Sequence, residues 1–139
     1  MKLLAVLLIA GCDHRPHVTN CDDDLHGVWV GSDRWMILDE HEAIEAYPLF
    51  IDNDSGNPDV IAAPRVIDLH RDGGALAGEL ERRYMHRADE CVTHVPVHVT
   101  ACKDDTLDIV FSDVPYPLTL APCSWPQPPS SRVEHWRRE

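Results

Sequence analysis

Apolar and polar residues alternate along most of the chain from Leu25 onward, and turn-forming residues recur at short intervals. A period of two is typical of strands with one buried face, whereas a helix repeats its apolar positions every three or four residues. Strands are therefore expected at 27–30, 34–38, 43–51, 65–70, 75–86, 91–101, 106–111 and 118–120. About eight short strands in so short a chain predict an all-β domain, a small antiparallel meander built as a barrel or a sandwich.

The clearest unit is a hairpin of residues 75–86 and 91–101 around a turn at 87–90. Its apolar residues share one face of each strand, Leu76, Leu80 and Tyr84 in the first and Val95, Val97 and Val99 in the second. Burial requires the register that pairs valines with leucines, which turns Glu79 and Glu81 outward beside His94 and His98. Pro96 has no N–H group for a ladder, so its strand is expected to lie at an edge or to bulge there.

The N-terminus has the layout of a secretory signal. Lys2 is followed by eight apolar residues, a run too short to span a membrane, which needs about 20 residues. The run ends in Leu8-Ile9-Ala10-Gly11-Cys12, which resembles the lipobox of bacterial lipoproteins. The resemblance implies cleavage before Cys12 and lipid attachment to its thiol. The alternative is an ordinary signal peptide with an incidental cysteine.

The chain has five cysteines, and lipidation of Cys12 leaves an even set. In an exported protein four cysteines predict two disulfides, and a four-thiolate zinc site would want Cys-x-x-Cys pairs, which are absent. Cys91 and Cys102 bracket one strand and would lie about 36 Å apart if it is extended, too far for a disulfide. A chain that returns after residues 106–111 would bring Cys123 near Cys102. We therefore expect the pairs Cys102–Cys123 and Cys21–Cys91.

Charge and size limit the function further. After cleavage about 128 residues remain, with 11 basic against 24 acidic side chains and a formal net charge of −13. Such an acidic body is repelled by nucleic acid phosphates and by anionic lipid headgroups, so neither is an expected partner. The length suits one domain with one core, and 44% hydrophobic residues with four Trp predict a globular chain.

The expected organisation has four parts. They are a signal peptide at 1–11, a polar tether at 12–24, a β domain at 25–123 and a proline-rich segment at 124–139. The last segment reads as an extended connector. Val133 and Trp136 near its end could dock on the domain, and a frayed tail is the alternative.

Gly27-Val28-Trp29, at the start of the first expected strand, resembles the Gly-x-Trp that opens lipocalins and related calycin barrels. The resemblance implies that Trp29 is structural and plugs the closed end of a barrel, that Gly27 lets the backbone pass close by, and that an apolar ligand enters at the opposite end. A similar start also occurs in other small envelope lipoproteins without catalytic activity.

Candidate sites for chemistry are few. Residues 52–59 resemble the opening of a calcium loop, but Ala63 stands where an EF-hand needs a bidentate Glu. His94 and His98 would lie about 13 Å apart on a strand, too far to share one ion. No Ser-His-Asp pattern, phosphate loop or His-Glu-x-x-His motif is present. We therefore expect neither a metal nor a cofactor.

The expected function is that of a non-catalytic, lipid-anchored envelope lipoprotein that binds a small apolar ligand or an envelope protein. The alternative is a metal-dependent or catalytic envelope protein. Asp13 directly follows the lipidated cysteine, which in enteric bacteria resembles a signal for retention in the inner membrane. Inner and outer membrane both remain open, and the domain would face the periplasm or the cell exterior.

The anchor gives a first prediction. The Cys12→Ser variant has no thiol to accept the lipid, so it should leave the detergent phase on phase partitioning, where the wild type stays. Quantitative partitioning of the variant into detergent, as for the wild type, would contradict the lipoprotein interpretation.

Overall fold

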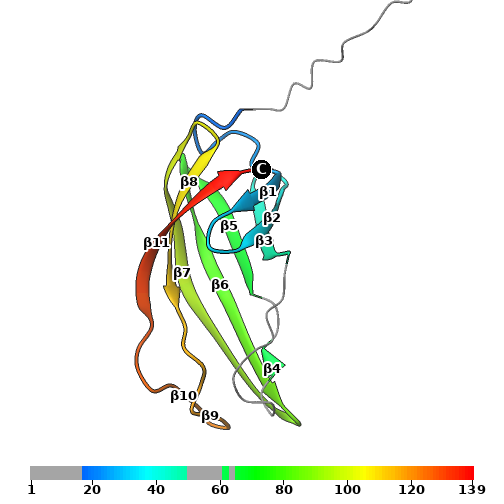
Figure 1. Cartoon of the computed structure of the whole chain (residues 1–139), viewed down its shortest axis with the longest axis vertical. Coiled ribbons are helices and arrows are strands. Elements are labelled where there is room, and N and C mark those ends of the chain that lie inside the picture. Colours follow the sequence, from blue (N-terminus) through cyan, green and yellow to red (C-terminus); the bar gives the residue numbers. More distant parts are fainter. Residues whose placement is uncertain (1–16, 50–60, 63–64) are drawn as a thin grey trace, which may run out of the picture.

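Eight antiparallel strands close into a barrel in the computed structural model, which describes residues 17–49, 61–62 and 65–139 (Figure 1). The barrel strands are β1 (Gly27–Val30), β2 (Arg34–Asp39), β3 (Ala43–Pro48), β5 (Val66–Asp72), β6 (Ala75–His86), β7 (Asp89–Lys103), β8 (Thr106–Asp113) and β11 (Ser130–Arg138). Each pairs with the next, and β11 returns to β1. The short β4 (Ile61–Ala62) pairs with β6, while β9 (Thr119–Leu120) and β10 (Cys123–Ser124) form a separate pair. The all-β prediction is confirmed, and the architecture is a barrel.

The β6–β7 hairpin has the expected register. Leu80 is opposite Val95, and His94 is opposite Glu81 with its ring 3.5 Å from the Glu79 carboxylate. Pro96 lies at an edge, because β8 pairs with β7 only from Val97 onward. The hairpin therefore extends beyond the barrel wall at its turn.

Strand β11 is the largest departure from the expected organisation. We expected the β domain to end at residue 123 and its last strand at 118–120, but β11 closes the barrel and residues 119–120 lie in the small β9–β10 pair. Trp136 is 1% exposed. The apolar alternation of β11 is interrupted because Arg132 and Glu134 share its inner face, where each charge has a partner.

The barrel interior is filled by side chains. Trp29, Trp35 and Trp136 are buried, and the last two stack with ring centroids 5.1 Å apart. The apolar core residues retain at most 5% of their accessible surface. Side chains of the described core residues are therefore closely packed. Gly31 allows the packing, since a Cβ there would overlap the Trp136 ring.

The expected tether is partly wrong. Residues 17–26 form an N-terminal plug across one end of the barrel, and its apolar residues Val18 and Leu25 are both 0% exposed. Polar side chains surround these two residues in the sequence, which hides them from an analysis of periodicity. Residues 12–16 lie outside the described residues.

The cysteines form two disulfides, but the expected pairing is wrong. Cys21 pairs with Cys102 and Cys91 with Cys123, with Cα atoms 5.1 Å and 5.5 Å apart. After β8 the chain runs on to the end of the barrel where Cys91 lies, instead of turning back to Cys102. The plug reaches Cys102 at the other end. Cys91 and Cys102 do lie far apart along one strand, as expected.

Candidate functional site

Arg71 of β5 holds the plug onto the barrel. Its guanidinium donates two parallel hydrogen bonds of 2.8 and 2.7 Å to the Asp39 carboxylate, and these side chains are only 9% and 3% exposed. The remaining donors reach the carbonyls of Cys21, Asp23 and His41. All five guanidinium N–H groups therefore have acceptors, the condition under which a buried arginine is tolerated.

Asp39 is satisfied just as completely. Besides Arg71, it accepts hydrogen bonds of 2.8 Å from the backbone N–H groups of Leu25 and His41. Leu25 in turn accepts a 2.8 Å bond from the indole N–H of Trp29. The plug, β2 and β5 are thus joined through one polar network beneath the apolar core.

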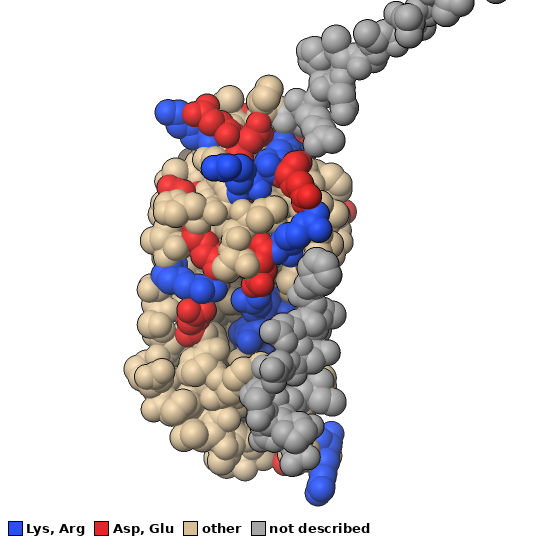
Figure 2. All heavy atoms as spheres, viewed as in Figure 1, with Lys and Arg blue, Asp and Glu red and all other residues tan. Residues whose placement is uncertain are grey.

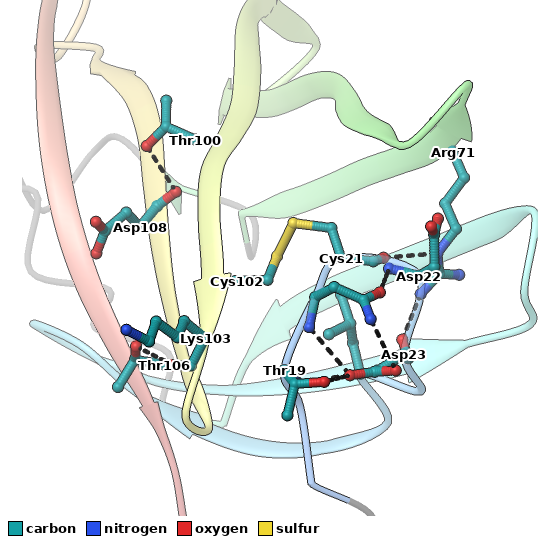
Figure 3. Close-up of a disulfide and its surroundings, with 12 residues drawn as sticks. Thr19, Cys21, Asp22, Asp23, Arg71, Thr100, Cys102, Lys103, Thr106 and Asp108 are labelled. Carbon is teal, nitrogen blue, oxygen red and sulfur yellow. Dashed lines mark hydrogen bonds between the residues drawn. A yellow bond between two sulfur atoms is a disulfide. The ribbon is translucent and has the colours of Figure 1, made fainter.

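Two further contacts fix the ends of the plug. Asp105, in the β7–β8 turn, accepts a 2.9 Å bond from the backbone N–H of Val18. The Cys21–Cys102 disulfide joins the plug to β7, and Figure 3 shows it with Thr19 and Asp23 of the plug nearby. Arg138 of β11 stacks 5.5 Å from the Trp29 ring and donates to the carbonyls of the plug residues Asp24 and His26.

Gly27 connects the plug to β1. Its φ of 135° is a conformation that side-chain-bearing residues rarely adopt. Trp29 lies beside the plug at this end of the barrel. Both residues of the predicted Gly-x-Trp motif therefore have structural positions.

Three carboxyl groups of this end have pKa values below their ordinary range. Burial raises the pKa of Asp39, but hydrogen bonds from Arg71, Leu25 and His41 together lower it further than burial raises it. The pKa of Asp23 is lowered mainly by the backbone N–H groups of Thr19 and Asn20. The pKa of Asp105 is lowered first by the Val18 N–H and then by His17.

The opposite end carries what we call the uncharged arm, residues 114–129. This stretch contains no Asp, Glu, Lys, Arg or His in a chain of which 26% is charged, and it holds six of the 11 prolines. The Cys91–Cys123 disulfide joins it to β7. Tyr116 packs edge-on against Tyr84 of β6, 5.2 Å between centroids. A small second core therefore holds the arm in place.

The arm offers an apolar surface. Leu118 is 68% exposed, and a groove of about 300 Å³ lies between residues 117–121 and the β6–β7 turn, where His86 and Asp89 line it. Figure 2 shows a continuous area without Lys, Arg, Asp or Glu at the lower left, the end where Figure 1 places β9 and β10. This area is uncharged and includes exposed Leu118, and exposed apolar side chains in such an area can mark an interaction site.

Between the arm and the core, three arginines lie over aromatic rings on the inner side of the sheet. The pairs are Arg65 over Trp35 at 5.1 Å, Arg82 over Tyr84 at 5.4 Å and Arg132 over Phe111 at 4.9 Å. A small cavity of about 30 Å³ lies among them, lined by Arg65, Leu80, Arg82, Phe111, Ser112, Asp113 and Val114. The hairpin pattern already places Arg82 on the face of Leu80 and Tyr84, so this arginine could have been singled out from the sequence.

Other predicted positions either lie outside the described residues or are apart from one another. Cys12 and the calcium-like loop at 52–59 lie outside the described residues. His98 is opposite Ala77, so it does not join His94 in a cluster. Within the described ranges no group of three or more His, Cys, Asp or Glu is arranged to hold a metal. The same ranges contain no helix long and apolar enough to cross a membrane.

No protein-family model, curated protein or solved structure matches the chain. The resemblance of Gly27 and Trp29 to the lipocalin motif therefore stays a prediction.

The lowered pKa values predict acid sensitivity. The unfolded chain binds more protons than the folded one at pH values between the lowered pKa and the ordinary value of about 3.9. The stabilisation that these carboxylates give is therefore complete above about pH 5. It is lost as the pH falls from the ordinary pKa toward the lowered one. Urea unfolding between pH 7 and pH 3 should show this loss, and Asp105→Asn should reduce it.

Asp104→Asn is the matched control, because Asp104 occupies the same turn and its side chain is 79% exposed. It should keep the pH dependence of the wild type. Equal pH dependence in all three proteins would contradict the role assigned to Asp105.

Proposed function

We propose that the protein is a lipid-anchored, non-catalytic module of the bacterial cell envelope, which binds a small ligand or an envelope partner at the end of the barrel that carries the uncharged arm. The observation that carries the proposal is the difference between the two barrel ends. One end is covered by the N-terminal plug, and the pocket of about 520 Å³ beside it is rimmed by the charged residues Asp24, Arg34, Arg138 and Glu139. The other end presents exposed Leu118, a groove and a cavity.

The proposed anchor fits this division. Only five residue steps separate Cys12 from His17, at most about 18 Å of extended chain. Lipid on Cys12 would therefore keep the plugged end near the membrane and direct the arm away from it. The two disulfides are consistent with an oxidising compartment such as the envelope.

The packed core affects where a ligand would bind. Because Trp35, Trp136 and Phe111 retain at most 2% of their accessible surface, the barrel centre offers little room for a ligand. The arm and the cavity beside it do offer space. We therefore assign ligand contact to this end rather than to the centre of the barrel.

Native mass spectrometry of the protein purified from its own membranes tests the proposal. Wild type should carry a stoichiometric small molecule or protein, and Leu118→Asp should reduce its occupancy several-fold by placing a charge in the apolar surface. Val30→Asp, at a 39% exposed valine of β1, should keep wild-type occupancy. A stoichiometric metal would favour the alternative of a metal-dependent protein, and a protein with nothing bound would contradict the binding module.

A further inference from the structure

Arg82 differs from its neighbour on β6 in having no counterion among the described residues. Arg83 faces outward and contacts the carboxylates of Glu81 and Glu90. Arg82 faces inward and is half-buried, and its guanidinium lies over the Tyr84 ring. Within the described part of the chain no carboxylate lies within ion-pair distance of it. A partly buried arginine without a counterion is costly, and an anion beside it would offset that cost.

Strand register places a second arginine next to it. Val66, the first residue of β5, is opposite Glu81 of β6, so Arg65, just before the strand, is next in line with Arg82. Like charges on facing positions repel each other. Both arginines line the same cavity of about 30 Å³. An anionic group between them would relieve the repulsion and accept hydrogen bonds from both.

Neighbouring carboxylates already have partners other than Arg82. Asp33 is paired with Arg65, and Asp113 lies 3.2 Å from the Nε atom of Arg132. The Glu134 carboxylate is 2.7 Å from Arg132 and also accepts the Trp136 indole N–H. Among the described residues of this cluster, Arg82 is therefore the arginine without an ion pair.

The cavity also has apolar walls, formed by Leu80, Phe111 and Val114. Val114 is the first residue of the uncharged arm, so these walls are continuous in sequence with the surface that presents Leu118. We propose that Arg82, with Arg65, binds the carboxylate or phosphate group of an amphipathic ligand whose apolar body lies toward the arm. This inference rests on the proposed function and specifies the chemistry of its ligand.

Calorimetric titration of the full chain held in phosphatidylcholine nanodiscs tests the inference at constant ionic strength. The probes are octanoate, octyl phosphate and, as the uncharged comparison, octanol. Octanoate and octyl phosphate separate the two possible head groups. At least one of them should bind to wild type, and octanol at least about tenfold more weakly, because only the anions gain charge-assisted hydrogen bonds.

Arg82→Gln should weaken binding of the anion at least about tenfold, whereas Arg83→Gln, the matched control, should bind as wild type does. Thermal melts of both variants would establish that they fold. Equal affinity of wild type and Arg82→Gln, or equal affinity for anion and octanol, would overturn the inference. If Leu118→Asp still removes a copurified ligand in that case, the proposed function stands without the anionic head group.

Discussion

The ion pair between Arg71 and Asp39 allows irregular backbone to seal one end of the barrel. Segments that are not strands leave carbonyl and N–H groups without ladder partners, and burying them unpaired is costly. Arg71 donates hydrogen bonds to the carbonyls of Cys21 and Asp23, and the Asp39 carboxylate accepts one from the N–H of Leu25. With the polar groups satisfied, Val18 and Leu25 can cover the apolar core.

The seal gives the two ends different properties. The plugged end contains the carboxylates with lowered pKa values, the Cys21–Cys102 disulfide and the C-terminal residue, whose backbone N–H bonds to Val28. At the other end the uncharged arm rests on its own small core around Tyr84. A chain that is strongly acidic thus keeps one region without charge, where an apolar or singly charged partner can approach without repulsion.

Much of the barrel could be predicted from local pattern. The β6–β7 alternation fixed a register because a slip of one residue would bury Glu79 and Glu81. The Gly73-Gly74 pair between β5 and β6 suits a tight hairpin turn, because glycine readily adopts the positive φ angles that both residues have. The plug and β11 were not predictable in this way. Their inward polar groups are stabilised by partners far along the chain, as Arg71 lies about 50 residues from Cys21.

The candidate site shows the same limit. The face of Arg82 follows from its spacing to Leu80, whereas its proximity to Arg65 depends on a pairing between two strands. The disulfides likewise depend on the path of the uncharged arm, which carries Cys123 to Cys91. Pattern along one strand therefore predicts which way a residue faces, and only the tertiary arrangement shows what it meets.

Urea unfolding at pH 7 of three variants tests the role of the ion pair most directly. Arg71→Met leaves a buried carboxylate without its counterion and should lower the free energy of unfolding by about 3–5 kcal/mol. Arg71→Met with Asp39→Asn should lose less, because Asn is neutral and keeps an oxygen for the Leu25 N–H. Arg34→Met, which breaks an exposed pair with Glu139, should cost less than about 1 kcal/mol. An Arg71→Met variant as stable as Arg34→Met would contradict the account.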